Sequence, residues 1–484
     1  MKRHLCLLLV ARAVLFAACK SDSGQTGAPA DLLAPSGDLG TPPDAATGAP
    51  VEVLPGSYLL DGITTDAWLV FHDSHAYYVA DTAGANLKAT KLVEYNAKGP
   101  YASDVRGRVV FISPNLDASG IGPLVVWSST APAPSTVSMA SSVFARDANG
   151  DGSTVAYSTN VDAARMTGDF VLDDIAHTAP RTIASQANVL QCPFKSAFSG
   201  ARFLLSYCPG GAVDQALVSF HVPTGKATTL LPSTNANWQI DDAGTNVIAT
   251  NSQFQGVLIP LSGGPAVQLV PQDFGEGFFT AGGDAVIYKT VFGRHLERVD
   301  VTGKNRRILQ PNDVYTIYGA SPDRKWTVFA ANLDQKTSFH DLFLASVEDS
   351  RPPVTVTAMT NADLSHGPAF TDDSNYVITG VDAAADVPVP TAILTQPTAG
   401  GSGRKFGSGR IYKWADAGGA KIVFEDNQHI VQRRFIADIH LVDLVRGDAP
   451  TLLQANAFAE VVVAPDKKRI FFSTDKGIFA AEVH

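Results

Sequence analysis

A short polar turn followed by a run of β-branched and aromatic residues recurs at intervals of about 45 residues in this 484-residue chain. Residues 321–330, which begin Ser-Pro-Asp, return 143 residues later as residues 464–473, which begin Ala-Pro-Asp. Such self-similarity is typical of stacked units, none of which buries its apolar face alone. The recurrence therefore predicts one repeat architecture in place of several unrelated domains.

Each repeat has the pattern of a small antiparallel sheet. Turn residues that tolerate positive φ precede four to six β-formers, as where Gly107 precedes residues 108–112. Third strands are expected at 341–347, 438–444 and 477–483, and fourth strands at 227–231, 306–309 and 353–356. After residue 18 the chain has no window with persuasive helical periodicity. Four strands in each unit, repeated radially, describe a β-propeller.

The Ser-Pro-Asp turn at Asp323, with its Val-Phe strand and its later Asp-Leu-Phe-Leu-Ala strand, resembles the Pro-Asp repeats of TolB-like β-propellers. The same turn returns at Asp466 and in part at Asp373. The resemblance implies an all-β fold, a single β-propeller of about eight to ten four-stranded blades in residues 51–484. The resemblance indicates the fold but implies no particular activity, because many unrelated functions share this turn. We expect residues 51–54, or the strand after them, to close the ring beside the final unit.

The N-terminus has the pattern of an export signal. Lys2 and Arg3 precede an apolar run over residues 5–18, which ends at Cys19. Residues 15–19, Leu-Phe-Ala-Ala-Cys, resemble the lipobox of bacterial lipoproteins. The resemblance implies a signal peptide over 1–18, a lipid on Cys19 and a place in the bacterial cell envelope, at the outer membrane or periplasmic face. The alternative is an ordinary secretory signal in which Cys19 is incidental.

Residues 19–50 form the lipidated N-terminus and a tether in this interpretation. They consist almost wholly of Gly, Ala, Pro, Ser, Thr and Asp, without an aromatic residue. Such a segment cannot bury enough apolar surface to offset chain ordering, so we expect a disordered tether with a mean reach of roughly 30 Å. The whole chain carries a formal net charge of −10, which argues against nucleic acid as a partner because phosphates would repel it.

Two cysteines remain beyond the signal region, Cys192 and Cys208, on either side of a predicted hairpin at Gly200. Pairing centred on Gly200 would place them directly opposite each other, about 4.5 Å apart at Cα, which permits a disulfide. An oxidising compartment favours that bond. The alternative is a pair of buried thiols.

A second candidate site is the segment with Asp147, Asn149 and Asp151, which fits the first half of a calcium loop and resembles the Asp-rich loops of integrin-type propellers. Ser158 stands where such a loop has glutamate. No cofactor is therefore required, calcium is possible, and an elongated repeat turn is the alternative. His72 and His75 are expected to be solvated turn residues.

A third candidate is the glycine-rich, basic segment 400–410. Arg404, Lys405 and Arg410 could form a loop that receives an anion or an acidic partner. The segment lacks the Gly-Lys-Ser/Thr ending of a P-loop, and an ordinary inter-strand loop is the alternative.

The sequence contains no Gly-x-Ser-x-Gly motif on a strand-to-helix turn. We therefore expect a non-catalytic, membrane-anchored envelope lipoprotein whose propeller binds a protein or glycan partner. The alternative is a propeller enzyme, such as a lyase, hydrolase or lactonase, with a metal-assisted site in the central channel.

Overall fold

The structure is a computed structural model. It describes residues 49–84, 86–96, 100–143, 145–178, 180–190, 195–209, 215–311, 313–333, 340–348, 352–360, 368–381, 390–407, 414–431, 434–447 and 449–483. Residue contacts divide the chain after Ala45, and every described residue belongs to the second unit, Ala46–His484.

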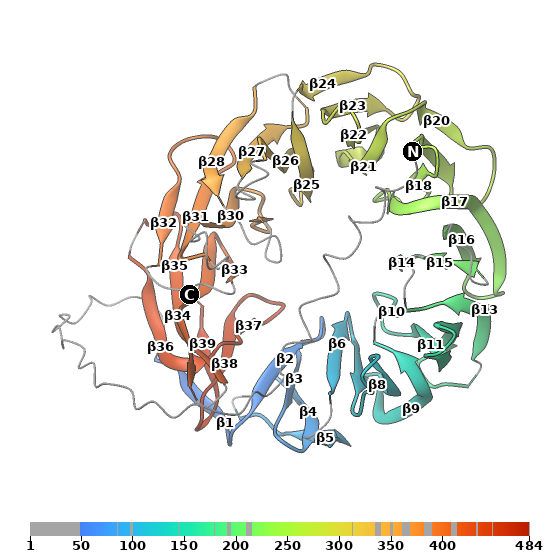
Figure 1. Cartoon of the computed structure of the whole chain (residues 1–484). Coiled ribbons are helices and arrows are strands. Elements are labelled where there is room, and N and C mark those ends of the chain that lie inside the picture. Colours follow the sequence, from blue (N-terminus) through green and yellow to red (C-terminus); the bar gives the residue numbers. More distant parts are fainter. Residues whose placement is uncertain are drawn as a thin grey trace, which may run out of the picture. The chain divides into compact units, whose positions relative to one another are not determined.

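The described strands of this unit form nine antiparallel sheets, eight with four strands and one with seven. The seven-stranded sheet consists of two blades that share β17 (Lys226–Ile240). The first half of β17 pairs with β16, and its second half pairs with β18. The described strands therefore make up ten blades, which follow one another around a ring (Figure 1). This count lies within the predicted range, and the all-β propeller prediction is confirmed.

The blades have the following strands in chain order. Blade 1 contains β2 (Leu59–Ile63), β3 (Trp68–His72), β4 (Ala76–Asp81) and β5 (Thr90–Glu94); blade 2 contains β6 (Ala102–Arg106), β7 (Val109–Ser113), β8 (Ile121–Ser128) and β9 (Ala131–Ser142); blade 3 contains β10 (Arg146–Ala148), β11 (Thr154–Asp162), β12 (Thr167–Asp174) and β13 (Arg181–Asn188). Blade 4 contains β14 (Lys195–Ser199), β15 (Arg202–Tyr207), β16 (Gln215–His221) and the first half of β17; blade 5 contains the second half of β17, β18 (Asn246–Asn251), β19 (Gly256–Pro260) and β20 (Val267–Val270). Blade 6 contains β21 (Phe274–Phe279), β22 (Ala285–Thr290), β23 (Leu296–Asp300) and β24 (Arg307–Gln310); blade 7 contains β25 (Val314–Ala320), β26 (Trp326–Ala331), β27 (His340–Ser346) and β28 (Val354–Thr360). Blade 8 contains β29 (Ala369–Phe370), β30 (Tyr376–Val381), β31 (Ala392–Pro397) and β32 (Arg404–Phe406); blade 9 contains β33 (Trp414–Gly418), β34 (Lys421–Val431), β35 (Arg434–Asp443) and β36 (Thr451–Phe458); blade 10 contains β37 (Val462–Val463), β38 (Arg469–Ser473), β39 (Gly477–Glu482) and β1 (Val51–Pro55).

The ring closes between its two ends. β1 pairs antiparallel with β39, with Val51 opposite Ala480, so the outer strand of blade 10 comes from the start of the ring. This confirms the predicted closure. The described ranges contain no α-helix, and Ala281–Gly283 form a 3-10 turn, η2. In the same ranges we find no helix long and apolar enough to span a membrane.

The recurring turn is held by its own side chains. Ser321 Oγ donates to Asp323 Oδ1 at 2.6 Å and accepts from the Trp326 backbone N–H at 3.0 Å, while Arg324 adopts φ 56°. An equivalent pair of bonds recurs around Thr371 in blade 8. The polar residue and the aspartate two positions later are thus needed to reverse the chain between the first and second strands.

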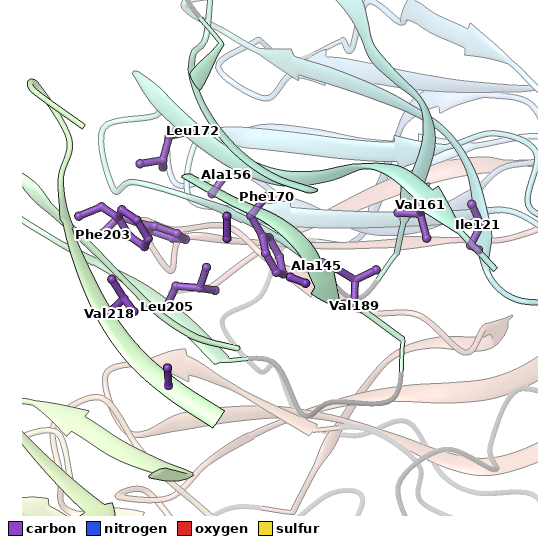
Figure 2. Close-up of a cluster of buried hydrophobic side chains, with 14 residues drawn as sticks. Ile121, Ala145, Ala156, Val161, Phe170, Leu172, Val189, Phe203, Leu205 and Val218 are labelled. Carbon is purple, nitrogen blue, oxygen red and sulfur yellow. The ribbon is translucent and has the colours of Figure 1, made fainter. Parts of the chain in front are cut away.

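The hydrophobic core is divided among the contacts between blades. Ten buried clusters, formed by described residues, lie one between each pair of successive blades. In β7, Val110 and Ile112 pack toward blade 1, whereas Val109 and Phe111 pack toward blade 3. Figure 2 shows the cluster in which Phe170 of blade 3 meets Phe203 of blade 4. A second strand is therefore apolar on both faces, because a neighbouring blade covers each one.

Candidate functional site

First strands such as β6, β25 and β33 lie toward the middle of the ring (Figure 1). β6 contains no buried residue, and it includes Asp104 and Arg106. β14 likewise has no buried residue and begins with Lys195. Charged side chains therefore lie on the inner strands β6 and β14.

Four successive inner strands form a pocket of about 240 Å³. β14, β17, β21 and β25 contribute its walls, so the pocket spans blades 4 to 7. Its polar lining residues are Lys195, Asn237, Gln239 and Glu276. Its lining also includes Trp238 and the apolar residues Phe278 and Ile317. The pocket thus combines one cation, one carboxylate, two side-chain amides and an apolar surface.

Lys195 lies at one side of the pocket, against the ring of Trp238. Its Nζ is 4.7 Å from the ring centroid and donates to the Trp238 carbonyl oxygen. Burial of the ammonium lowers the pKa of Lys195, and the negative charge of Glu276 opposes that shift. Over the whole residue, Lys195 is nevertheless exposed.

Glu276 lies on β21 and is fixed by the next blade. Its Oε1 accepts from Thr316 Oγ1 at 3.3 Å and from the Ile317 backbone N–H at 3.2 Å. It also opposes the decrease that burial causes in the pKa of Lys289, on the neighbouring strand β22. The carboxylate is therefore held in a defined position between two lysines of blades 4 and 6.

Two polar atoms in the pocket wall lack partners among the described residues. Gln239 Oε1 and Trp238 Nε1 are buried and make no hydrogen bond there. An unsatisfied buried acceptor or donor costs roughly 1–3 kcal/mol. A bound group that bonded to either atom would remove that cost.

A second polar group lies on the inner strands of blades 2 and 3. Arg106 Nε donates to Asp104 Oδ2 at 2.9 Å, whereas Arg146 Nε is 3.8 Å from the same oxygen. Arg146 is 5 % exposed, and burial lowers its pKa to about 10. Asp147, the residue after it, accepts from Ser196 Oγ at 2.7 Å. This network joins three inner strands next to Lys195.

The predicted calcium segment spans strand β10 and the turn that follows it in blade 3. Asp147 lies in β10, and burial raises its pKa. Asn149 Oδ1 accepts from the Thr154 backbone N–H at 2.9 Å. Asp151 Oδ1 accepts from the Ser153 backbone N–H at 2.9 Å. These bonds are those of a hairpin turn, and calcium at this segment stays a prediction. Among the described residues, no group of three or more His, Cys, Asp or Glu side chains is placed to hold a metal ion.

The expectation that His72 is solvated was wrong. His72 ends β3 and is 7 % exposed, and its Nδ1 lies 2.7 Å from Asp61 Oδ2. Asp61 also accepts from Ser103 Oγ at 2.6 Å, which joins blade 1 to blade 2. His75 is exposed in the following turn, as expected. His72 is buried because the strand continues one residue beyond the apolar run.

The predicted register of the cysteine hairpin was also wrong. Ser199 pairs with Arg202 across a two-residue turn, so the centre of pairing lies between Gly200 and residue 201. The described pairs of this hairpin have numbers that sum to 401, from Lys195 with Ser206 to Ser199 with Arg202, whereas the predicted centre at Gly200 requires a sum of 400. Cys208 is nevertheless buried and disulfide-bonded. Cys192, its expected partner, lies outside the described residues, as does Cys19.

The basic segment is not an open loop over its described part. Arg404 and Lys405 lie in β32, the outer strand of blade 8, with Phe406 buried beside them. Arg404 donates to the Gly447 carbonyl oxygen at 2.6 Å and lies 5.0 Å from the Phe406 ring centroid. The glycines before Arg404 form the turn that precedes β32. The strand continues to Phe406, whose side chain is buried. Arg410 lies outside the described residues.

Comparisons with known proteins bear on the fold alone. No family model matches the chain, and no curated protein matches it. Among solved structures, a eukaryotic initiation factor has a TM-score of 0.50 at 13 % identity over 73 % of this chain and 88 % of that chain. The C-terminal WD40 domain of Sif2 has a TM-score of 0.38 at 9 % identity, over 91 % and 100 %. An oligogalacturonate lyase from Vibrio parahaemolyticus also has a TM-score of 0.38, at 10 % identity over 80 % and 97 %. Identities this low do not transfer a ligand.

Proposed function

We propose that this protein is a lipid-anchored binding propeller of the bacterial envelope, and that the pocket of blades 4 to 7 binds a glycan. The pocket carries the binding part of the proposal. Residues 1–19, with their basic start, apolar run and cysteine, support the anchor.

The mixture of groups in the pocket favours a neutral, hydroxyl-rich ligand. Lys195 and Glu276 have opposite charges, so the pair offers both a donor and an acceptor with little net field. Asn237 and Gln239 add amides that both donate and accept. Phe278 and Ile317 provide the apolar surface on which one face of a sugar ring can rest. A charged ligand would find one favourable partner and one repulsive one.

The size of the pocket supports a single ring as the bound group. A volume of about 240 Å³ is below the usual range for drug-sized ligands, roughly 300–1,000 Å³. One sugar unit of a longer glycan fits this limit better than the surface of a folded protein does. The rest of the glycan would extend along the inner strands.

An array of neutral and acidic envelope glycans, followed by calorimetry, tests the binding. Glu276→Gln keeps the Oε1 acceptor but removes the charge, and a charged hydrogen bond contributes about 1.5–3 kcal/mol. We expect the affinity for a neutral glycan to fall at least roughly tenfold. Glu482→Gln, at an exposed position of β39, is the matched control. Equal affinities for both variants, or binding of acidic glycans alone, would contradict the proposal.

Metabolic labelling tests the anchor independently. Labelled palmitate should appear in the wild-type protein and be absent from Cys19→Ser. Equal labelling of both chains, or none in the wild type, would show that Cys19 carries no lipid, whatever the pocket binds.

A further inference from the structure

The hairpin of β34 and β35 extends beyond the other strands of blade 9. β33 pairs with β34 between Lys421 and Phe424, and the ladder between β35 and β36 starts at Ile436. Beyond these points the two strands pair with each other, Ile430 opposite Phe435 and Val431 opposite Arg434. We call residues 430–431 and 434–435 the finger.

The finger exposes large apolar side chains. Ile430 is 64 % exposed, Phe435 is 54 % exposed and Val431 is 42 % exposed. Directly opposed residues of an antiparallel pair project from the same face, so Ile430 and Phe435 form one apolar surface. Neighbouring exposed hydrophobic residues at the end of a projecting element are typical of a docking site.

The opposite face of the finger contacts the ring. Arg434 lies 4.8 Å from the ring centroid of Phe458 and donates to Ser57 Oγ at 3.0 Å. Since Arg434 and Phe435 are consecutive, their side chains point to opposite faces of the strand. The Ile430–Phe435 surface therefore faces away from these contacts.

The contact with Ser57 locates the finger beside the entry of the chain into the ring. Ser57 lies between β1 and β2, a few residues after the predicted tether of 19–50. We propose that the finger docks on the surface of a lipid bilayer, with Ile430 and Phe435 in the acyl boundary and Arg434 near anionic headgroups. This inference rests on the proposed anchor, because a lipid on Cys19 would keep the finger close to the bilayer and make even a weak contact effective.

The chemistry of the finger matches an interface of this kind. Aliphatic and aromatic side chains enter the boundary between headgroups and acyl chains, and an exposed arginine on the other face of the same hairpin is attracted by anionic lipids. Anionic vesicles should therefore bind the finger better than neutral vesicles.

Flotation with vesicles tests the inference on residues 46–484, whose ring closes within that range through β1 and β39. The probe is a vesicle of phosphatidylethanolamine and phosphatidylglycerol, compared with one of phosphatidylcholine. We expect the double variant Ile430→Ser/Phe435→Ser to lower the bound fraction roughly fivefold or more. The matched control is Ile308→Ser/Val354→Ser, which removes two similarly exposed apolar side chains from blades 6 and 7.

Arg434→Gln should weaken binding to the anionic vesicles about fivefold and leave binding to phosphatidylcholine unchanged. Unchanged melting temperatures would show that all variants remain folded. Equal flotation of the finger variant and the control variant would overturn the inference, as would a wild type that fails to float. A finger that instead pairs two copies would give a dimer that the double variant abolishes, without vesicle binding. Because residues 46–484 lack Cys19, each of these outcomes is independent of palmitate labelling and of the pocket.

Discussion

The first and second strands of the blades lie side by side in every sheet but are built from different residues. All five residues of β7 are buried, whereas its neighbour β6 has none buried and carries Asp104 and Arg106. The second strand is covered by a blade on each face, while the first strand lies at the inside of the ring. Stability should therefore depend mainly on second strands, and binding on first strands.

The largest expected effect comes from the core of a second strand. Phe111→Ala in β7 removes a fully buried ring between blades 2 and 3 and should lower the free energy of unfolding by about 3–5 kcal/mol. Arg106→Ala, on the adjacent first strand, should change it by less than roughly 0.5 kcal/mol. Denaturant unfolding measures both. Similar losses in the two variants would remove the distinction between the strands.

The disulfide of Cys208, next to the end of second strand β15, should have a somewhat smaller effect. Cys208 is disulfide-bonded, and a bond to Cys192 would close a loop of roughly 15 residues. Cys208→Ser should therefore lower the free energy of unfolding by about 3 kcal/mol. Melting with and without reductant checks this, since reductant should destabilise the wild type alone. A wild type insensitive to reductant would indicate that the bond does not stabilise the blade.

A turn between a first and a second strand should give a pH-dependent effect. Burial alone would raise the pKa of Asp241, but hydrogen bonds from Asn246 and Thr245 outweigh it and hold the pKa below its ordinary value. The contribution of the carboxylate to stability is thus present above the ordinary pKa of about 4 and is lost as the pH falls through the folded-state pKa.

We therefore expect Asp241→Asn to be less stable than the wild type by about 2 kcal/mol at neutral pH, with a difference that shrinks in acid. Unfolding at several pH values measures this difference. A constant difference down to low pH would show that the charge of Asp241 is not involved.

The smallest effect should come from calcium. The side chains of Asn149 and Asp151 already accept backbone hydrogen bonds in the turn of blade 3, so we expect this turn to form without an ion. Chelator and millimolar calcium should shift the melting temperature by less than about 1 °C. A shift of several degrees that Asp151→Asn abolishes would instead establish the predicted calcium site.

The fold could be predicted because its signals are local and repeated. The turn residues Ser321 and Asp323 hydrogen-bond to each other within one hairpin, and the same residue types recur along the chain. The sharing of β17 by two blades could not be predicted, since residues 232–237 (Pro-Ser-Thr-Asn-Ala-Asn) have the composition of a loop, yet one strand runs through them and changes partner at Thr234.

The candidate site was missed because its residues are distant in sequence. Lys195 and Glu276 lie on different blades and meet only because the ring brings their first strands together. His72 was misread because the turn after it is polar, although its partner Asp61 is eleven residues earlier on the paired strand. An alignment of the repeats by first strand could have marked Glu276 as a charged inner residue. For Asp61 and His72, the signal was that the two residues lie on the paired strands of one hairpin, where their side chains can meet.

One paired measurement tests the separation of binding from stability most directly. Gln239 of β17 and Ile248 of β18 are directly opposite in the same sheet, yet Gln239 lines the pocket and Ile248 belongs to the core between blades 5 and 6. Gln239→Ala should lose roughly tenfold or more in glycan affinity without any decrease in unfolding free energy, and Ile248→Ala should lose about 2–5 kcal/mol of stability while the folded protein still binds. If affinity and stability fell together in both variants, the account would be contradicted.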